Sequence, residues 1–213
     1  MPTRFLFDGP EDARVTIMLA HGAGAPMDSA SMNAVTKALA GAGFRVARFE
    51  FGYMAARRSG EKKPPPKAES VMPEYVAAID DLGPTDGPLI IGGKSMGGRV
   101  ASMLADQLHD ARRIAGLLCL GYPFHPMGRP DQLRTKHLTG MTTPALICQG
   151  TRDEMGNRFE VGEYGLSDEI EVLWLEDGDH DLKPRKAISG FTTAGHLQTV
   201  AEKVTEWVGR IAP

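Results

Sequence analysis

Short apolar runs alternate with amphipathic stretches along most of the chain, and this alternation limits the folds that the chain can adopt. The apolar runs occupy positions 15–20, 44–49, 88–91, 114–120, 145–149 and 170–175. Near-continuous apolarity, in place of strict alternation of apolar and polar residues, is typical of strands buried on both faces of a parallel sheet. The sequence therefore predicts a doubly wound α/β fold, with a mostly parallel sheet of about six or seven strands flanked by helices.

The segments between the apolar runs carry helical periodicity. Val35 and Leu39 share one helix face, and Val200 and Val204 share another near the end of the chain. We find no internal repeat and no linker that would separate two domains. Residues 1–213 are expected to form a single domain, and their 23.0 kDa is enough to bury a sizeable core.

Composition limits the kinds of partner and the cellular location that we expect for this protein. A net charge of −3 gives no reason to expect nucleic acid or an anionic membrane as a partner. The apolar runs are too short to span a bilayer, and no basic-then-apolar leader opens the chain, so a cytoplasmic location is expected. Cys119 and Cys148 lie within apolar runs and are interpreted as reduced core thiols. We expect no metal and no cofactor.

Two long segments interrupt the alternation, at residues 52–67 and 121–138. The first contains several basic residues and a Pro-Pro-Pro sequence, and the second contains aromatic, histidine and proline residues. Both follow a predicted strand directly, so both are expected at the carboxyl edge of the sheet, where α/β folds bind ligands. We expect them to be ordered, irregular loops that line the mouth of a pocket.

The sequence Gly-Lys-Ser-Met-Gly at positions 93–97 stands between a predicted strand and a predicted helix. A strand–turn–helix with glycine two residues to either side of a serine is typical of a nucleophile elbow, because side chains at the glycine positions would collide with neighbouring elements. Ser95 is therefore the candidate nucleophile, and the Met96 N–H lies beside it at a helix N-terminus.

A phosphate-binding loop is the rival interpretation of Gly-Lys-Ser after a strand. That loop requires a glycine five residues before the Gly of Gly-Lys-Ser, because its backbone N–H groups wrap the phosphates. Here that position is Pro88, which has no N–H, and the residues that follow it are apolar strand. The sequence excludes a phosphate-binding loop.

A serine nucleophile needs a base and an acid that orients the base, and both candidates follow later strands. Asp153 comes just after the run at 145–149, and His180 comes in a Gly-Asp-His sequence after the run at 170–175. The order serine, acid, histidine is that of α/β folds with a nucleophile elbow. Glu154 is the alternative acid.

The loop after the first apolar run supplies small residues beside the predicted nucleophile. Its sequence His-Gly-Ala-Gly-Ala at 21–25 lets a backbone N–H approach a reacting carbonyl oxygen, and Ala23 is expected to provide it, with Gly24 as the alternative. His21 is interpreted as a brace for this loop. Possible substrate contacts are Gly24, Tyr53, Arg57, Lys94, Phe124 and His125, with Lys94 interpreted in the first place as facing solvent.

With these residues assembled, the chain resembles the α/β-hydrolase superfamily over nearly its whole length. The motifs at 21–24 and 93–98, with Asp153 and His180, carry the resemblance. The sequences at 51–54 and 121–126 resemble more narrowly a small bacterial branch near dienelactone-hydrolase-like proteins, which includes an animal chromatin-complex subunit. Dienelactone hydrolases use a cysteine nucleophile where this chain has Ser95, so lactone specificity does not transfer. The chain is too short for a large helical lid, which disfavours long-chain lipase activity.

The resemblance and the residues together imply a metal-independent serine hydrolase. The expected substrate is a small-to-medium carboxylic ester or thioester, cleaved by Ser95, His180 and Asp153 through an acyl-enzyme, with the N–H groups of Ala23 and Met96 binding the oxyanion. Two alternatives stay open. One is a non-enzymatic interaction module on a hydrolase scaffold, and the other is an acyltransferase or peptidase that uses the same residues. The sequence predicts no oligomeric state.

Overall fold

The computed structural model describes residues 2–61 and 63–212. Seven strands form one sheet in the order β1-β3-β2-β4-β5-β6-β7, and only β1 runs antiparallel to its neighbour. The strands are β1 (Phe5–Asp8), β2 (Thr16–Ala20), β3 (Arg45–Phe49), β4 (Leu89–Lys94), β5 (Gly116–Leu120), β6 (Ala145–Gly150) and β7 (Ile170–Leu175). The mostly parallel α/β fold predicted from the sequence is confirmed, with β1 added at the edge.

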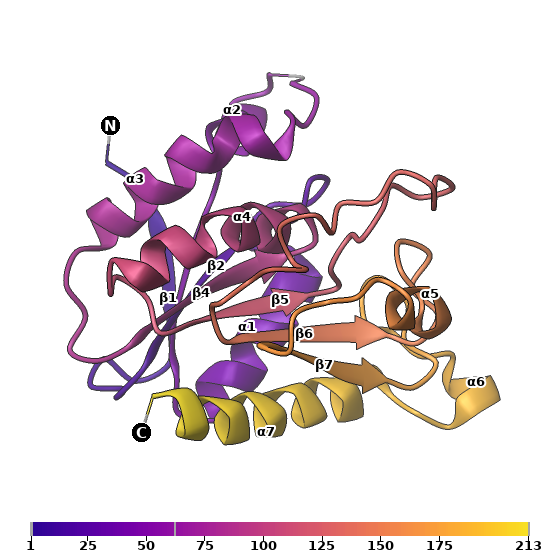
Figure 1. The fold of residues 1–213 in the computed structure, drawn as a ribbon. Helices are drawn as coiled ribbons and strands as arrows, with labels where there is room; N and C mark the ends of the chain where they lie inside the picture. Colours follow the sequence, from indigo (N-terminus) through magenta and orange to yellow (C-terminus); the bar gives the residue numbers. More distant parts are fainter. Residues whose placement is uncertain (1, 62, 213) are drawn as a thin grey trace.

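Helices cover both faces of the sheet (Figure 1). The longer ones are α1 (Ala30–Gly41), α3 (Met72–Leu82), α4 (Met96–Asp110) and α7 (Thr193–Ile211), and the shorter ones are α2 (Gly52–Arg58), the 3₁₀ helix η1 (Ala68–Val71), α5 (Arg158–Gly162) and α6 (Lys186–Ser189). Helices α1 and α7 pack against one face, and α3 and α4 pack against the other. Side-chain oxygens of Ser29 and Thr192 accept hydrogen bonds from the first turns of α1 and α7, which fixes where these helices begin.

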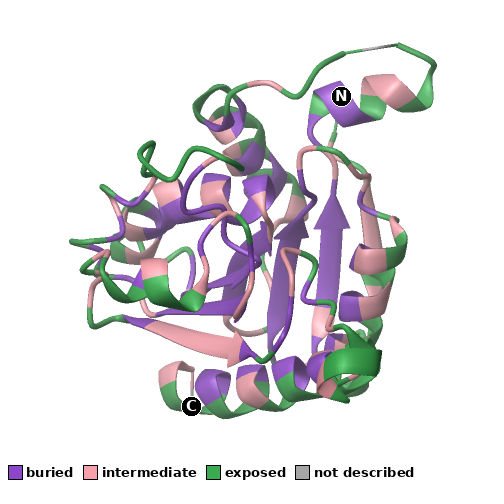
Figure 2. Cartoon of the chain, turned by 90° about the vertical axis from the view of Figure 1, so that its right-hand side faces the viewer, coloured by how far each residue is buried: buried purple, intermediate pink, exposed green. Residues whose placement is uncertain are grey.

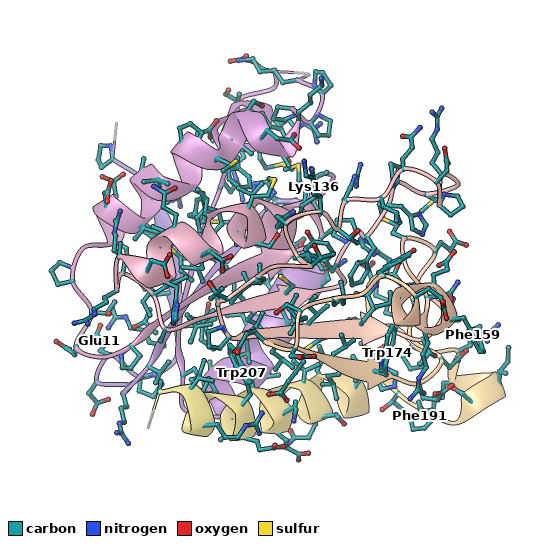
Figure 3. All side chains as sticks on the ribbon, viewed as in Figure 1. Glu11, Lys136, Phe159, Trp174, Phe191 and Trp207 are labelled. Atoms are coloured by element: carbon teal, nitrogen blue, oxygen red, sulfur yellow. The ribbon has the colours of Figure 1, made fainter. Side chains whose placement is uncertain are left out.

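Each face of the sheet has its own apolar core (Figure 2). Strand β2 shows the division, because Met18 faces α3 and α4 whereas Ile17 and Leu19 face α1 and α7. Trp207 lies buried between α7 and the sheet (Figure 3). Strand β2 is buried along its whole length, which explains its near-continuous apolar sequence.

The two long segments differ in structure. Residues 52–67 are not wholly irregular as expected, because α2 occupies their first half; Tyr53 and Met54 are buried and anchor this helix. Residues 121–138, in contrast, are irregular throughout. Both segments follow strands at the carboxyl edge, where the ends of the six parallel strands meet. In the part of the chain that the structure describes, no helix has the length and apolarity that crossing a membrane requires.

Candidate active site

Ser95 stands at the tip of the turn between β4 and α4. Its backbone has φ 51° and ψ −116°, a left-handed conformation that non-glycine residues rarely adopt and that surrounding contacts must hold. A Cβ on Gly93 or on Gly97 would lie 2.5 Å from the Ala20 carbonyl oxygen on the neighbouring strand. The two flanking glycines therefore allow the tight turn, and the serine is left partly exposed.

His180 lies between the two other side chains that the sequence analysis singled out. Its Nδ1 is 2.8 Å from Asp153 Oδ2, and its Nε2 is 2.8 Å from Ser95 Oγ. Because a carboxylate only accepts hydrogen bonds, Nδ1 carries the proton of the neutral ring, and Nε2 accepts the Ser95 hydroxyl. Glu154 is exposed, and within the described residues it makes no contact with His180.

Asp153 is fully buried and its carboxylate is held by several donors. The Gln149 side-chain amide donates to Oδ2 at 2.9 Å, and the Met155 N–H donates to Oδ1 at 2.8 Å. Removing a carboxylate from water costs free energy, and the hydrogen bonds from these donors offset that cost. Gln149 was not predicted to be part of the site. Its one signal in the sequence is that it is a lone polar residue at the end of an apolar strand.

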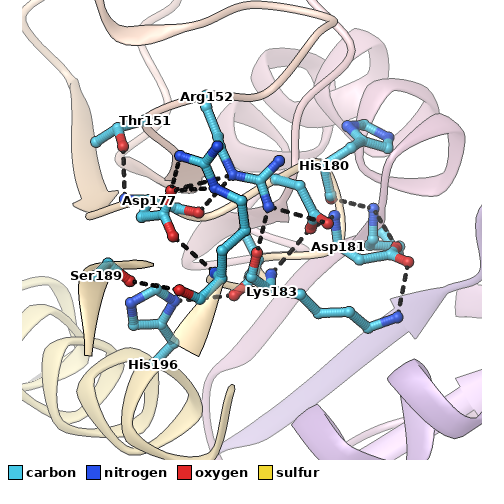
Figure 4. A network of polar contacts seen from close by, with 12 residues as sticks. Thr151, Arg152, Asp177, His180, Asp181, Lys183, Ser189 and His196 are labelled. Atoms are coloured by element: carbon cyan, nitrogen blue, oxygen red, sulfur yellow. Dashed lines mark hydrogen bonds and ion pairs between the residues drawn. The ribbon is translucent and has the colours of Figure 1, made fainter. Parts of the chain in front are cut away.

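A polar network fixes the loop that carries His180 (Figure 4). Asp177, at φ 57°, accepts the Arg185 N–H at 2.6 Å and the Arg185 Nε at 2.8 Å. Hydrogen bonds from Arg185 hold the pKa of Asp177 far below its usual range. Arg152 Nε donates to the Asp177 carbonyl at 2.7 Å and ties this loop to the segment that carries Asp153.

Lys94, at the end of β4, has a side chain only 11% exposed and does not face solvent, so that expectation was wrong. Its Nζ donates to the His180 carbonyl at 2.6 Å and lies 3.4 Å from Asp181 Oδ1. Burial lowers the pKa of Lys94, with the nearby carboxylates acting in the opposite direction. The side chain therefore holds the His180 backbone, and it does not line the cavity beside Ser95.

His21 orients the loop expected to supply the second oxyanion donor. Its Nε2 accepts the Phe51 N–H at 3.2 Å, so Nδ1 carries the proton and donates to the Gly22 carbonyl at 2.7 Å. A trans peptide directs its N–H opposite to its carbonyl, so this bond turns the Ala23 N–H away from the His21 ring. Burial lowers the pKa of His21, which favours this neutral form.

Ala23 and Met96, the residues expected to supply the oxyanion donors, line the same cavity as Ser95. Strands β2 and β4 are paired, with Ala20 opposite Gly93, so the loop after β2 lies next to the elbow. Among the described residues, neither N–H donates to a protein group. Gly24, the alternative donor, is exposed.

The remaining predicted substrate contacts lie at different places. Tyr53 donates to the Ala23 carbonyl at 3.0 Å, and Arg57 stacks over the Tyr53 ring at 5.4 Å. Burial raises the pKa of Tyr53 to about 12. Phe124 and His125 are buried and do not line the cavity over Ser95. Of these residues only Tyr53 touches the loop beside Ser95.

A cavity of about 500 Å³ opens over Ser95. It is lined from both long segments, which supports the expectation that they border the pocket. The lining residues are Ala23, Pro65, Pro66, Lys67, Ala68, Glu69, Ser95, Met96, Arg99, Pro123, Arg134 and Met155. Arg99 and Arg134 were not identified from the sequence. Arg99 follows Ser95 by one helical turn, and that spacing was the only available signal for it.

A second serine–histidine pair lies deeper in the molecule. Ser102 Oγ is 2.8 Å from His137 Nε2 and 3.1 Å from the Tyr122 hydroxyl. Ser102 is inside α4, only 3% exposed, and donates to the Arg99 carbonyl at 2.8 Å. Its proton is thus already used, which leaves its oxygen to accept from His137 or Tyr122.

The described residues contain no cluster of three or more histidine, cysteine or acidic side chains arranged to hold a metal ion. Cys119 and Cys148 are buried free thiols, and burial raises the pKa of both. Neither thiol therefore has the character of a reactive nucleophile.

Solved structures similar to this chain include several hydrolases. A dienelactone hydrolase from Anabaena variabilis has a TM-score of 0.73 and 17% identity, over 99% of this chain and 93% of that one. Est1E from Butyrivibrio proteoclasticus, solved with ferulic acid bound, has a TM-score of 0.69 and 18% identity, over 98% and 95% of the two chains. A serine hydrolase without a lid from Xanthomonas campestris has a TM-score of 0.66 and 17% identity, over 98% and 89%.

At these identities the likeness concerns the fold alone. The family itself is shown by a sequence model, described as an alpha/beta hydrolase domain, that matches residues 13–209. Strand order, the elbow at Ser95 and this match agree with one another. The chain belongs to the α/β-hydrolase domain family.

Proposed function

We propose that the protein is a serine hydrolase that cleaves a small-to-medium carboxylic ester or thioester. The observation that carries the proposal is the position of His180: its Nε2 is 2.8 Å from Oγ of Ser95, on the elbow at the end of β4, and its Nδ1 is 2.8 Å from Asp153 Oδ2. A serine hydroxyl is a weak nucleophile until such a base removes its proton. Similar structures that carry the words esterase or hydrolase in their names support this class of reaction.

The reaction begins when Ser95 Oγ attacks the acyl carbon and His180 Nε2 takes the hydroxyl proton. The carbonyl π electrons move to oxygen, and the Ala23 and Met96 N–H groups hydrogen-bond the oxyanion. Each such donor contributes about 3–4 kcal/mol to stabilising this state. Collapse of the intermediate expels the alcohol or thiol, which takes the proton from His180, and leaves the acyl group on Ser95.

The acyl-enzyme is then hydrolysed by the same steps, with water as the nucleophile. His180 takes a proton from water, the hydroxide attacks the acyl carbon, and Ser95 leaves with the proton from His180 as the carboxylic acid departs. Asp153 keeps the proton on Nδ1 throughout and stabilises the charged ring that forms in each half-reaction.

Covalent labelling with a fluorophosphonate probe tests the proposal. The probe should modify Ser95 in the wild type, located by peptide mass spectrometry, and should not modify Ser95→Ala. Ser102→Ala is the matched control, because Ser102 lies inside α4 and is also hydrogen-bonded to a histidine. Folded wild-type protein that never reacts, and that hydrolyses no p-nitrophenyl ester from acetate to octanoate, would overturn the proposal in favour of an interaction module.

A further inference from the structure

The cavity over Ser95 carries an excess of positive charge. Lys67, Arg99 and Arg134 line it, with Glu69 as the single acidic residue among the lining side chains. Arg99 pairs with Glu69 at 2.5 Å, which neutralises one positive charge. Two positive charges therefore remain without a matching carboxylate on the wall of this cavity.

Arg134 is the side chain whose charge is least compensated. It is half-buried on the segment after β5, and its backbone N–H donates to the Phe124 carbonyl at 2.7 Å, which fixes the loop at this point. Within the described residues its guanidinium forms no ion pair and no hydrogen bond. Burial, and then the charge of Arg99, lower the pKa of Arg134. Two guanidinium groups thus border one cavity. Arg99 is paired with Glu69, and Arg134 has no ion-pair partner among the described residues.

Arg99 also retains donor capacity. Its Nε is buried and has no hydrogen-bond partner among the described residues. Because the Arg99 N–H donates to the Ser95 carbonyl at 3.0 Å, the two residues are one turn apart on α4, about 6 Å along the helix axis. Ser95, Arg99 and Arg134 also line one cavity, so a group bound by the two arginines would share that cavity with an acyl group on Ser95.

Other basic residues of this edge of the sheet, including Arg57 and Lys94 that were predicted as possible substrate contacts, are engaged elsewhere. Arg58 pairs with Glu50 and Asp28, and Lys94 holds the His180 backbone. Arg57 donates to the Lys63 carbonyl at 2.8 Å. None of these three side chains lines the cavity over Ser95.

We propose that Arg134 and Arg99 form an anion subsite of the active-site cavity, so that the enzyme prefers an ester or thioester whose acyl chain bears a carboxylate or phosphate-like group a few bonds from the reacting carbonyl. Guanidinium groups with free N–H donors bind such oxyanions through charge-assisted hydrogen bonds. Partial burial in a cavity lined by prolines and methionines strengthens that attraction. This inference rests on the proposed hydrolase function for its placement beside Ser95.

Three ethyl esters of equal chain length test the preference. Monoethyl glutarate ends in a carboxylate, ethyl 4-phosphonobutanoate in a phosphonate, and ethyl 5-amino-5-oxopentanoate in a neutral carboxamide. We expect kcat/KM for at least one anionic ester to exceed that for the carboxamide by about 10-fold or more at low salt. The carboxylate and phosphonate arms identify the favoured anion, and the preference should shrink as ionic strength rises.

Arg134→Gln should abolish the preference, so that kcat/KM for the anionic esters falls to the value that the same variant shows for the carboxamide ester. Arg129→Gln is the matched control, because Arg129 is an exposed arginine of the same loop that does not line the cavity. An equal kcat/KM for all three esters, or a preference that survives Arg134→Gln, overturns the anion subsite and leaves the hydrolase proposal standing.

A binding measurement separates this inference from the proposed reaction. Glutarate and glutaramide are titrated calorimetrically into Ser95→Ala protein, which cannot turn over an ester by the proposed route. Suppose that Ser95→Ala binds glutarate but not glutaramide, and that the double variant Ser95→Ala/Arg134→Gln binds neither. This result supports the subsite even if the wild type hydrolyses nothing. No measurable glutarate binding, or equal binding of glutarate and glutaramide, overturns it.

Discussion

Two serines of one helical segment contact histidines at the same distance, and their surroundings differ. Ser95 Oγ and Ser102 Oγ are each 2.8 Å from a histidine Nε2. Ser95 precedes the first residue of α4 at a positive φ, whereas Ser102 is in the middle of that helix. A short serine–histidine distance therefore does not distinguish a nucleophile from a structural hydrogen bond.

The partners of each histidine distinguish the two pairs. His180 donates to the buried carboxylate of Asp153, which leaves Nε2 free to accept a proton. The charges acting on His137 are those of Arg99, Asp106 and Glu69, and burial lowers its pKa to about 4. Ser102 already donates to the Arg99 carbonyl, and the Tyr122 hydroxyl fills the space beside it. We therefore propose proton transfer for the first pair and a structural hydrogen bond for the second.

The largest expected effect is on catalysis. Ser95→Ala and His180→Ala should each lower kcat/KM for a p-nitrophenyl ester by about a thousandfold or more, because nucleophile and base act as one unit. Ser102→Ala and His137→Gln should stay within about threefold of the wild type, since neither side chain lines the cavity. Circular dichroism confirms folding of all four variants. Comparable losses in both pairs would show that the geometric distinction has no catalytic meaning.

Gln149 forms hydrogen bonds to Asp153 beside the Ser95 pair and to Tyr122 beside the Ser102 pair. Its removal should therefore lower both activity and stability. Its amide donates to Asp153 at 2.9 Å, and its Oε1 accepts the Tyr122 N–H at 2.7 Å. Gln149→Leu leaves the buried Tyr122 N–H and one carboxylate oxygen short of a partner. We expect about 2–3 kcal/mol less stability against urea and about a tenfold lower kcat.

Gln149→Glu serves as the comparison for that variant. It keeps the shape of the side chain and an acceptor for Tyr122, but places a second carboxylate beside Asp153. Its kcat should fall further than that of Gln149→Leu, because like charges oppose ionisation of Asp153. A kcat unchanged in both variants would contradict a role for Gln149 in positioning Asp153.

The parallel sheet and the location of the site could be predicted because both depend on local sequence. Strands β2, β5 and β6 are buried and their sequences are near-continuous apolar runs, and the chain leaves each of them at the same edge. Ser95, Asp153 and His180 each follow a run, so topology alone brings them near one another. Strand β1 escaped prediction because it is short and only partly buried at the sheet edge. The catalytic roles of the three residues remain predictions.

Other features of the site depend on contacts between distant segments. Lys94 follows an apolar run, and nothing in the local sequence indicates that the His180 carbonyl covers its ammonium group. Arg134 belongs to an irregular loop whose path is set by long-range hydrogen bonds such as the one to the Phe124 carbonyl. Side chains placed by such packing carry no periodic signal, so sequence patterns cannot assign them to a site.

The pH dependence of stability should report on His137. Its folded-state pKa of about 4 lies below the ordinary 6.5, so its contribution to stability is complete above pH 6.5 and is lost as the pH falls towards 4. Allowing for its partial exposure, we expect about 1–2 kcal/mol of this loss in urea unfolding. His137→Gln should show a correspondingly flatter profile over that range. An identical slope in both proteins would exclude His137 as a source of the acid sensitivity.

The smallest effect concerns backbone strain and should differ in sign between the two serines. Ser95 has φ 51°, which glycine adopts without the steric penalty of a Cβ, whereas Ser102 lies inside α4. Comparing Gly with Ala at each site removes the contribution of the hydroxyl. Ser95→Gly should be about 1 kcal/mol more stable than Ser95→Ala, and Ser102→Gly about 1 kcal/mol less stable than Ser102→Ala. Urea unfolding of the four variants measures both differences. A loss at both positions would mean that the elbow holds Ser95 without strain, and that only its contacts with His180 separate it from Ser102.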